Sequence, residues 1–240
     1  MNKPEPLRAI PNLGPETYAR WRGSEVGATT ERLERRLILE LVGDVDGRKV
    51  LDIGCGDGAF AVELWKHGAI VSGVDTSAEM IKAARRRAEA ERADIDFEVA
   101  AAERLPFASQ QFDVVTAVTI LCFVRDAAPT FREVVRVLRP DGRFVIGELG
   151  KWSLWAAGRR LRAWFGSQLW RRGRFRTAGE LARLASMAGL AVQQVRGAIY
   201  YPRWNLAARL FGPWDAALGR LTTIGAAFIG IAAHKPSLPS

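Results

Sequence analysis

The stretch that decides the fold is Val50-Leu51-Asp52-Ile53-Gly54-Cys55-Gly56-Asp57-Gly58, where an apolar run leads into a turn with glycine at every second position. A side chain at Gly54, Gly56 or Gly58 would keep a ligand away from the backbone, so the spacing predicts close approach of a ligand. The helix expected from about Ala59 directs its free amide groups and positive dipole end toward that ligand. This order of strand, turn and helix predicts a nucleotide-type site.

The glycine spacing excludes two common nucleotide sites. A phosphate-binding P-loop ends in Gly-Lys-Ser/Thr, and no lysine follows this turn. The dinucleotide motif GxGxxG places its last glycine three residues after the second, whereas this chain has GxGxG preceded by Asp52. A second strand is expected over residues 70–74. It ends at Asp75, about 20 residues beyond the glycines, where an acidic side chain can bind ribose hydroxyls.

With Asp52 leading it, the stretch resembles motif I of the class I S-adenosylmethionine (SAM) dependent methyltransferases. The resemblance continues through Leu105-Pro106-Phe107, Phe112-Asp113-Val114-Val115 and Leu138-Arg139-Pro140-Asp141-Gly142-Arg143. It is close over residues 36–150, and the family that the chain resembles is the methyltransferase type 11, ubiquinone–menaquinone methyltransferase-like family. The resemblance implies methyl transfer from SAM to a nucleophile, leaving S-adenosylhomocysteine. Asp52 would organise the turn and face the methionine end, and no metal site is predicted.

The resemblance also implies how the rest of the cofactor is held. Met80 lies where the family places an apolar contact on adenine, although core packing is an alternative explanation. Many relatives carry an aspartate for the adenine amino group where this chain has Ala101, so backbone groups around Ala102, or Glu103, are expected to hold adenine. The predicted cofactor-binding residues are Asp52, Gly54, Cys55, Gly56, Gly58, Asp75, Thr76, Met80, Ala102, Glu103, Val118 and Thr119.

Strand and helix patterns alternate from residue 50 to residue 148, which predicts a parallel sheet with helices on both faces. The continuous apolar run over residues 114–121 is typical of a strand buried on both faces, and its carboxyl end should border the ligand crevice. The family adds a Rossmann-like, seven-stranded, mostly parallel sheet. Its antiparallel last strand is expected at residues 222–233.

Composition separates the chain into unlike parts. The 240 residues carry a formal net charge of +9, but residues 1–150 hold 21 Lys plus Arg against 24 Asp plus Glu, whereas residues 151–240 hold 14 against 2. Such a one-sided charge indicates an anionic partner or surface for the C-terminal part. No apolar run approaches the ~20 residues of a membrane span, residues 1–11 lack a signal core, and two cysteines make no disulfide framework. A cytoplasmic location is expected, with peripheral contact at the inner membrane face as an extension.

Four segments are predicted: an N-terminal arm at 1–35, a SAM-binding core at 36–150, a basic aromatic helical cap at 151–176, and completion of the core at 177–240 with a second insertion at 200–220. The cap has no acid, eight Lys plus Arg and four tryptophans. It could line a substrate pocket, lie on an anionic membrane or bind RNA, and the pocket is preferred, with or without membrane contact.

The acceptor is expected to be a small, apolar or amphipathic molecule such as a quinone, phenol, lipid or thiol, because the cap is aromatic and acid-poor. Nucleic acid is the less favoured partner, and the oligomeric state is not predicted. Tyr18 and Trp21 would fold over the cofactor or merely anchor the arm. Cys122 is expected to be a small buried apolar residue, since no base adjoins it in sequence. The acceptor-pocket candidates are Tyr18, Trp21, Cys122, Trp152, Trp155 and Tyr200.

Overall fold

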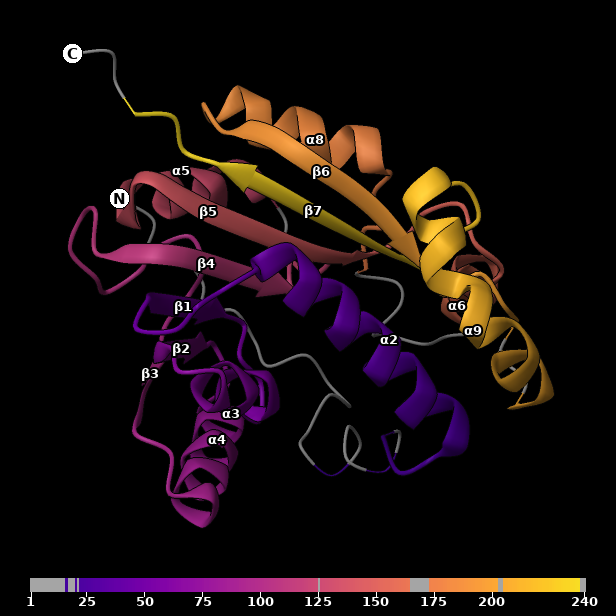
Figure 1. The fold of residues 1–240 in the computed structure, drawn as a ribbon, viewed down its shortest axis with the longest axis horizontal. Helices are drawn as coiled ribbons and strands as arrows, with labels where there is room; N and C mark the ends of the chain where they lie inside the picture. The colour runs from indigo at the N-terminus through magenta and orange to yellow at the C-terminus, as the bar shows by residue number, and fades with distance from the viewer. Residues whose placement is uncertain are drawn as a thin grey trace.

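The computed structural model describes residues 16, 20, 22–124, 126–164, 173–202 and 205–237, without the side chains of residues 162, 163, 205–211 and 213. Tyr18 and Trp21 lie outside the described residues. A single seven-stranded sheet crosses the molecule in the order β3-β2-β1-β4-β5-β7-β6 (Figure 1). The strands are β1 (Lys49–Ile53), β2 (Ile70–Asp75), β3 (Ile95–Val99), β4 (Phe112–Val118), β5 (Leu138–Leu149), β6 (Ala191–Ala198) and β7 (Phe228–His234).

Strands β1 to β5 are parallel, and β7 runs antiparallel between β5 and β6. This confirms the predicted Rossmann-like fold with its antiparallel last strand. That strand is shorter than expected over residues 222–233, because the chain turns at Ile224 and Gly225, where Gly225 has a φ of +83°. β7 therefore begins only at Phe228.

Helices cover both faces of the sheet (Figure 1). One face packs against α2 (Glu25–Val42), α3 (Ala59–Lys66) and α4 (Ala78–Glu91), and the other against α5 (Ala127–Val137) and α8 (Ala178–Met187). Strand β4 serves both cores, since Val114 packs on the first side and Val115 on the second, and both are buried. This explains its continuous apolar sequence.

The helix starts follow from local capping. Ser77 accepts a hydrogen bond from the Met80 amide and begins α4, and Thr177 forms a capping box with Glu180 at α8. Helix α2 begins at Glu25, because the Ser24 hydroxyl accepts from the Gly27 amide. The helix thus crosses residue 35, which is the expected limit of the N-terminal arm.

Two further helices, α6 (Leu154–Trp164) and α9 (Asn205–Leu221), lie at one end of the molecule (Figure 1). Helix α6 falls in the segment predicted to be a helical cap, and α9 in the predicted second insertion. Across the described ranges, no helix combines the length and apolarity needed to cross a membrane.

Candidate functional site

The glycine turn follows the carboxyl end of β1, between β2 on one side and β4 on the other. The chain passes from β1 outward to β2 and β3 and then returns to β4 on the opposite side of β1. Open α/β sheets bind ligands at such a reversal of strand order, beyond the carboxyl ends of the strands. The Gly54 and Cys55 amides both donate to the Val74 carbonyl, at 2.7 and 2.9 Å, which fixes the turn against β2.

The three glycines of the turn all have positive φ, but they do different things. A Cβ at Gly54 would lie 1.9 Å from Ile120 Cγ2, and one at Gly58 would lie 2.9 Å from Ala84 Cβ. Protein packing alone therefore requires glycine at these two positions. A Cβ at Gly56 would meet nothing within 4 Å. Of the three, only Gly56 has the open space that a ligand approaching the backbone needs.

Two acids flank the turn, the half-buried Asp75 and the buried Asp52. Asp75 accepts hydrogen bonds from the Gly56 amide at 3.0 Å and the Ser77 amide at 2.9 Å, so its carboxylate is held at the carboxyl end of β2. Burial raises the pKa of Asp75 despite these bonds. Asp52 is 2% exposed and accepts from the Thr116 hydroxyl at 2.7 Å. Burial raises the pKa of Asp52 to about 7, partly opposed by that hydrogen bond.

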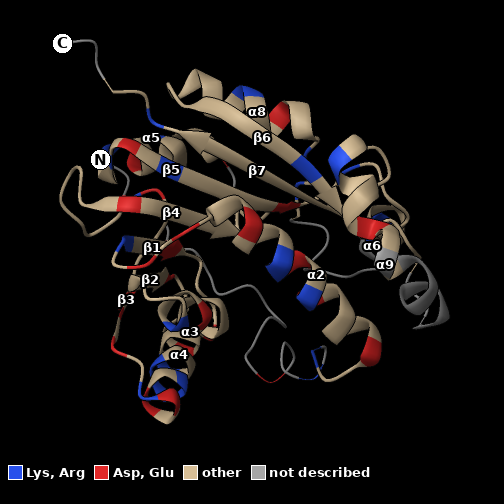
Figure 2. Ribbon diagram, in the orientation of Figure 1, with Lys and Arg blue, Asp and Glu red and all other residues tan. Residues whose placement is uncertain are grey.

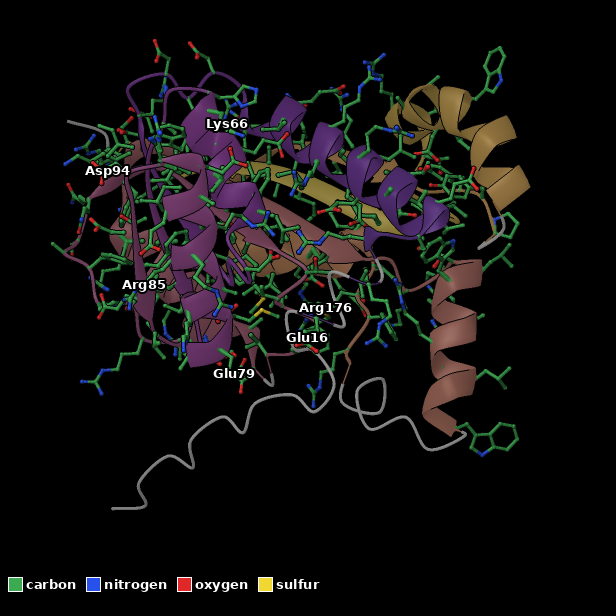
Figure 3. The ribbon with its side chains drawn as sticks, turned by 90° about the horizontal axis from the view of Figure 1, so that it is seen from below. Glu16, Lys66, Glu79, Arg85, Asp94 and Arg176 are labelled. Carbon is green, nitrogen blue, oxygen red and sulfur yellow. The ribbon has the colours of Figure 1, made fainter. Side chains whose placement is uncertain are left out.

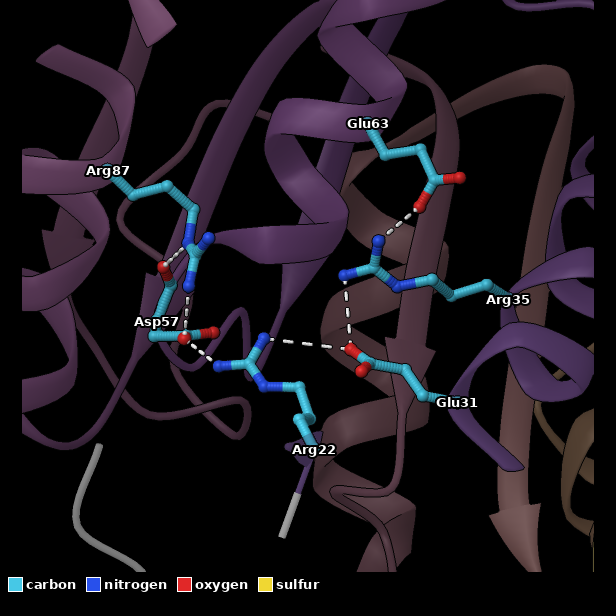
Figure 4. Close-up of polar contacts among 6 residues, drawn as sticks. All are labelled: Arg22, Glu31, Arg35, Asp57, Glu63 and Arg87. Atoms are coloured by element: carbon cyan, nitrogen blue, oxygen red, sulfur yellow. Dashed lines mark hydrogen bonds and ion pairs between the residues drawn. The ribbon is translucent and has the colours of Figure 1, made fainter. Parts of the chain in front are cut away.

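A third acid, Asp57, ties the turn to the N-terminal segment, which sequence reasoning missed. Its carboxylate accepts hydrogen bonds from Arg22 and from Arg87, the latter at 2.7 Å (Figure 4). Burial alone would raise the pKa of Asp57, but the two guanidinium groups hold it below its ordinary value. Arg22 also lies 3.6 Å from a carboxylate oxygen of Glu31 on α2. A contact 35 residues apart in sequence leaves no local pattern from which to predict it.

The other predicted cofactor residues surround the same edge of the sheet but differ in exposure. Met80 and Ala102 are buried, Glu103 is half-buried and Thr76 is exposed. The Ala100 amide donates to the Asp75 carbonyl at 3.1 Å, so the segment that begins at Ala100 starts beside the end of β2. Position 101 offers no carboxylate, as the sequence requires.

The opposite rim is the loop after β4, where Val118 and Thr119 are half-buried and Thr119 has a φ of +58°. Glu148 at the end of β5 accepts from the Leu121 amide at 2.6 Å, and Arg176 donates to the Leu121 carbonyl at 2.6 Å. Burial raises the pKa of Glu148 to about 7. No role was predicted for Glu148 or Arg176 from the sequence. The signal for Glu148 was an acid directly after the apolar run of residues 144–147.

Three acceptor-pocket candidates occupy packing positions in this structure. Cys122 is 1% exposed, and burial raises the pKa of its thiol, which makes it an inert apolar side chain as expected. Trp155 is buried and donates from Nε1 to the Tyr201 carbonyl at 2.7 Å, instead of lining an open pocket. The Tyr200 hydroxyl donates to the Thr222 carbonyl.

The fourth described candidate, Trp152, is 65% exposed, with Lys151 and Arg160 within cation–π distance of its ring. The arrangement therefore brings the predicted cofactor residues to one edge of the sheet, and among the acceptor candidates it places Trp155 beside Tyr201, the neighbour of Tyr200. Among the residues that the structure describes, no group of three or more His, Cys, Asp or Glu side chains could hold a metal ion.

Comparison with known proteins matches the part of the chain that contains the glycine turn. The model of a methyltransferase domain matches residues 51–146. An uncharacterised protein of Mycobacterium tuberculosis is 32% identical over 227 residues, which are 91% of this chain and 73% of that protein. The ubiquinone biosynthesis O-methyltransferase of Coxiella burnetii is 33% identical over 105 residues, 44% of this chain and 45% of that enzyme.

Solved structures show the same fold. A SAM-dependent methyltransferase of Thermotoga maritima has a TM-score of 0.69 at 23% identity, covering 92% of this chain and 95% of its own. A geranyl diphosphate methyltransferase in complex with GPP and sinefungin has a TM-score of 0.64 at 22% identity, covering 84% of this chain and 76% of its own.

Proposed function

This chain belongs to the SAM-dependent methyltransferase family, with SAM as its cofactor, and from that premise we propose that it methylates a small lipophilic or amphipathic acceptor. The main support for a cofactor site is the open space beside Gly56, where a Cβ would meet nothing within 4 Å. Gly56 follows the carboxyl end of β1, and the carboxylates of Asp75 and Asp52 are held by hydrogen bonds on either side of it. Backbone can meet a ligand there without displacing any side chain.

The residues present fit a nucleoside with a cationic amino acid end. Asp75, held by the Gly56 and Ser77 amides, would accept hydrogen bonds from ribose hydroxyls. Asp52, in its charged form, would face the methionine ammonium group. Met80 and the backbone around Ala102 would contact adenine, where this chain lacks the usual carboxylate.

SAM supplies a sulfonium-bound methyl group, so the hard chemistry belongs to the cofactor. What the protein contributes is alignment of an acceptor atom and exclusion of water. Glu148 and Arg176 would help to align the acceptor indirectly. Glu148 holds the Leu121 amide and Arg176 holds the Leu121 carbonyl, in the loop beyond β4. We assign no catalytic base, because Cys122 is inert and Glu148 is bonded within the loop.

The acceptor class rests on composition and on the names of relatives. The 151–176 segment has four tryptophans and no acid, which suits an apolar or anionic molecule better than a cationic one. Ubiquinone biosynthesis and geranyl diphosphate appear in the names of two matched proteins. We therefore favour a quinone, phenol or other prenylated or lipid-like acceptor, methylated on oxygen, carbon or sulfur.

Two other functions compete with this proposal. RNA methylation is favoured by the excess of 14 Lys plus Arg over 2 acids in residues 151–240, and it requires RNA affinity that falls steeply with salt. A SAM-binding protein without turnover is favoured by Ala101. It would bind SAM and label no fraction of a cell extract.

Radiolabelled SAM, offered with a panel of lipophilic phenols, quinones and thiols and separately with tRNA and rRNA, tests the proposal. We expect label in the organic extract of at least one lipophilic acceptor and none in RNA. Gly56→Asn, which places a side chain on the open face, should abolish the labelling, whereas Gly47→Asn should retain it. Label in RNA alone would replace the proposal with the first alternative, and SAM binding without any label would replace it with the second.

A further inference from the structure

Large apolar side chains gather on the outer surface of α6 and α9. Of the exposed large apolar residues in the described part of the chain, eight of twelve lie within residues 152–164 and 214–224. Six of these on the two helices, which we call the outer face, are between 40 and 83% exposed. They are Leu154, Leu161 and Trp164 on α6 and Trp214, Leu218 and Leu221 on α9.

Helix α9 is held so that this surface must point outward. Asp215 is 3% exposed and accepts from the Ile199 and Tyr200 amides, at 2.8 and 3.0 Å. One turn later, a Cβ at Gly219 would lie 1.9 Å from the Gly197 carbonyl oxygen, so the helix touches β6 there. Since positions 215 and 219 face the sheet, positions 214, 218 and 221 share a stripe on another side of the helix.

Helix α6 is oriented in a similar way by the buried Trp155, whose indole donates to the Tyr201 carbonyl. Leu154 and Leu161, two turns apart on one line of the helix, are exposed as a result. Figures 1 and 3, two views at right angles, both place α6 and α9 at the same end of the molecule. The two helices that carry the outer face therefore lie at the same end of the protein.

The charge around the outer face is positive. By sequence, α6 has three arginines and no acid, and α9 has two arginines and one acid. The acid Asp215 and the α6 arginine Arg159 are both buried and add no exposed charge, while Arg160 and Arg220 are exposed. Exposed Trp and Leu beside Arg are typical of helices that lie in the interface of an anionic bilayer. Each basic side chain near such a surface adds to the attraction.

We propose that the outer face docks this protein on an anionic lipid bilayer, with α6 and α9 lying in the plane of the headgroups. A second copy of the chain is disfavoured as the occupant, because a symmetric contact would bring the exposed Arg160 and Arg220 of two copies together. RNA is disfavoured because exposed leucines offer nothing to phosphates or bases. The proposal concerns location and does not depend on which acceptor is methylated.

Sedimentation of the full chain with vesicles tests the docking. We expect it to bind phosphatidylcholine vesicles that contain phosphatidylglycerol, to bind phosphatidylcholine alone weakly, and to be released by salt. The triple variant Trp164→Ala/Trp214→Ala/Leu221→Ala should lower binding to the anionic vesicles at least about tenfold. The matched control Ile70→Ala/Val99→Ala/Met187→Ala, which removes exposed apolar side chains elsewhere, should bind like the parent.

A second variant guards against misfolding of the first. Arg160→Glu/Arg220→Glu leaves the apolar side chains in place and should also weaken binding to anionic vesicles, with an unchanged melting temperature. The proposal is overturned if the parent does not bind these vesicles or if the folded triple variant binds as the parent does. It is also overturned if the outer-face variants change only the molar mass by light scattering or the affinity for RNA.

Discussion

The edge of the sheet at the glycine turn and the outer face of α6 and α9 are built in opposite ways. At the edge, Asp52, Asp57 and Asp75 are each bonded to a specific donor, and two of the three glycines are required by packing. On the outer face, the large side chains are exposed, and the proposed docking would depend on how many apolar and basic groups are present more than on the contacts of any one residue.

Figure 2 shows acids and bases interspersed on α3 and α4, and Figure 3 places Lys66, Glu79 and Arg85 toward the end of the molecule away from α6 and α9. An ordinary solvated surface has such mixed charges, whereas the outer face does not. The edge that we propose as the cofactor site is held by individual contacts, whereas the proposed docking surface would act through the sum of many exposed groups.

The largest effect is expected where packing at the edge is broken. Gly54→Val should lower the free energy of unfolding by about 3 kcal/mol or more, because the new side chain would overlap Ile120 and occupy a backbone with φ of +71°. Gly47→Val is the matched control, since its φ is +67° and nothing lies within 4 Å. Urea unfolding measures both. Equal losses at the two positions would contradict the packing requirement.

A smaller loss is expected when α9 is released from the sheet. Asp215→Ala leaves the Ile199 and Tyr200 amides without their acceptor and should cost about 2 to 3 kcal/mol. Asp215→Asn keeps one acceptor oxygen and should cost less. Hydrogen exchange should quicken over residues 205–221 and stay slow in β1 and β4. If SAM affinity fell together with the protection of α9, the two regions would be coupled instead of separate.

SAM affinity should depend on the protonation state of Asp52. If its charged form faces the methionine ammonium group, a pKa of about 7 in the free protein makes SAM affinity rise about tenfold between pH 6 and pH 8. Asp52→Asn should bind more weakly and show a flat profile in calorimetry. Thr116→Val, which removes the hydroxyl that lowers this pKa, should move the rise to higher pH. A parent profile that is already flat would remove Asp52 from the site.

Asp52 should also make the free energy of unfolding depend on pH in a predictable direction. The folded state holds the Asp52 proton more tightly than the unfolded chain, so the unfolding free energy falls as the pH rises from about 4 to about 7. Its contribution to the slope is at most about 1.4 kcal/mol per pH unit. Asp52→Asn should remove that contribution, and an unaltered slope would contradict the raised pKa.

The smallest effect is expected at the contact between Arg22 and Asp57. A double-mutant cycle with Arg22→Ala and Asp57→Asn should give a coupling free energy of about 1 kcal/mol, since both side chains are partly buried. Arg36→Ala with Glu40→Gln, an exposed pair on α2, is the comparison and should couple by about 0.3 kcal/mol. A coupling no larger than that would mean that Asp57 does not hold the N-terminal segment.

The sequence predicted the parallel sheet, the glycine turn and the cofactor, because each depends on residues close together in the chain. The burial of Cys122 was also predicted correctly, since it follows a continuous apolar run. The contacts of Asp57 with Arg22 and of Glu148 with Leu121 span 35 and 27 residues, and no periodicity records them. The buried position of Trp155 was missed for a similar reason, since its hydrogen-bond partner is 46 residues away.

Calorimetric titration of SAM into the parent, Gly56→Asn and Gly47→Asn tests whether SAM lies against the glycine turn at Gly56. Asparagine tolerates the left-handed backbone at both positions, so the two variants share a similar conformational cost. They differ in place, since Gly47 precedes β1 and Gly56 follows it. We predict binding by the parent and by Gly47→Asn, and none by a Gly56→Asn variant with an unchanged melting temperature. Equal SAM affinity in the two variants would contradict the claim.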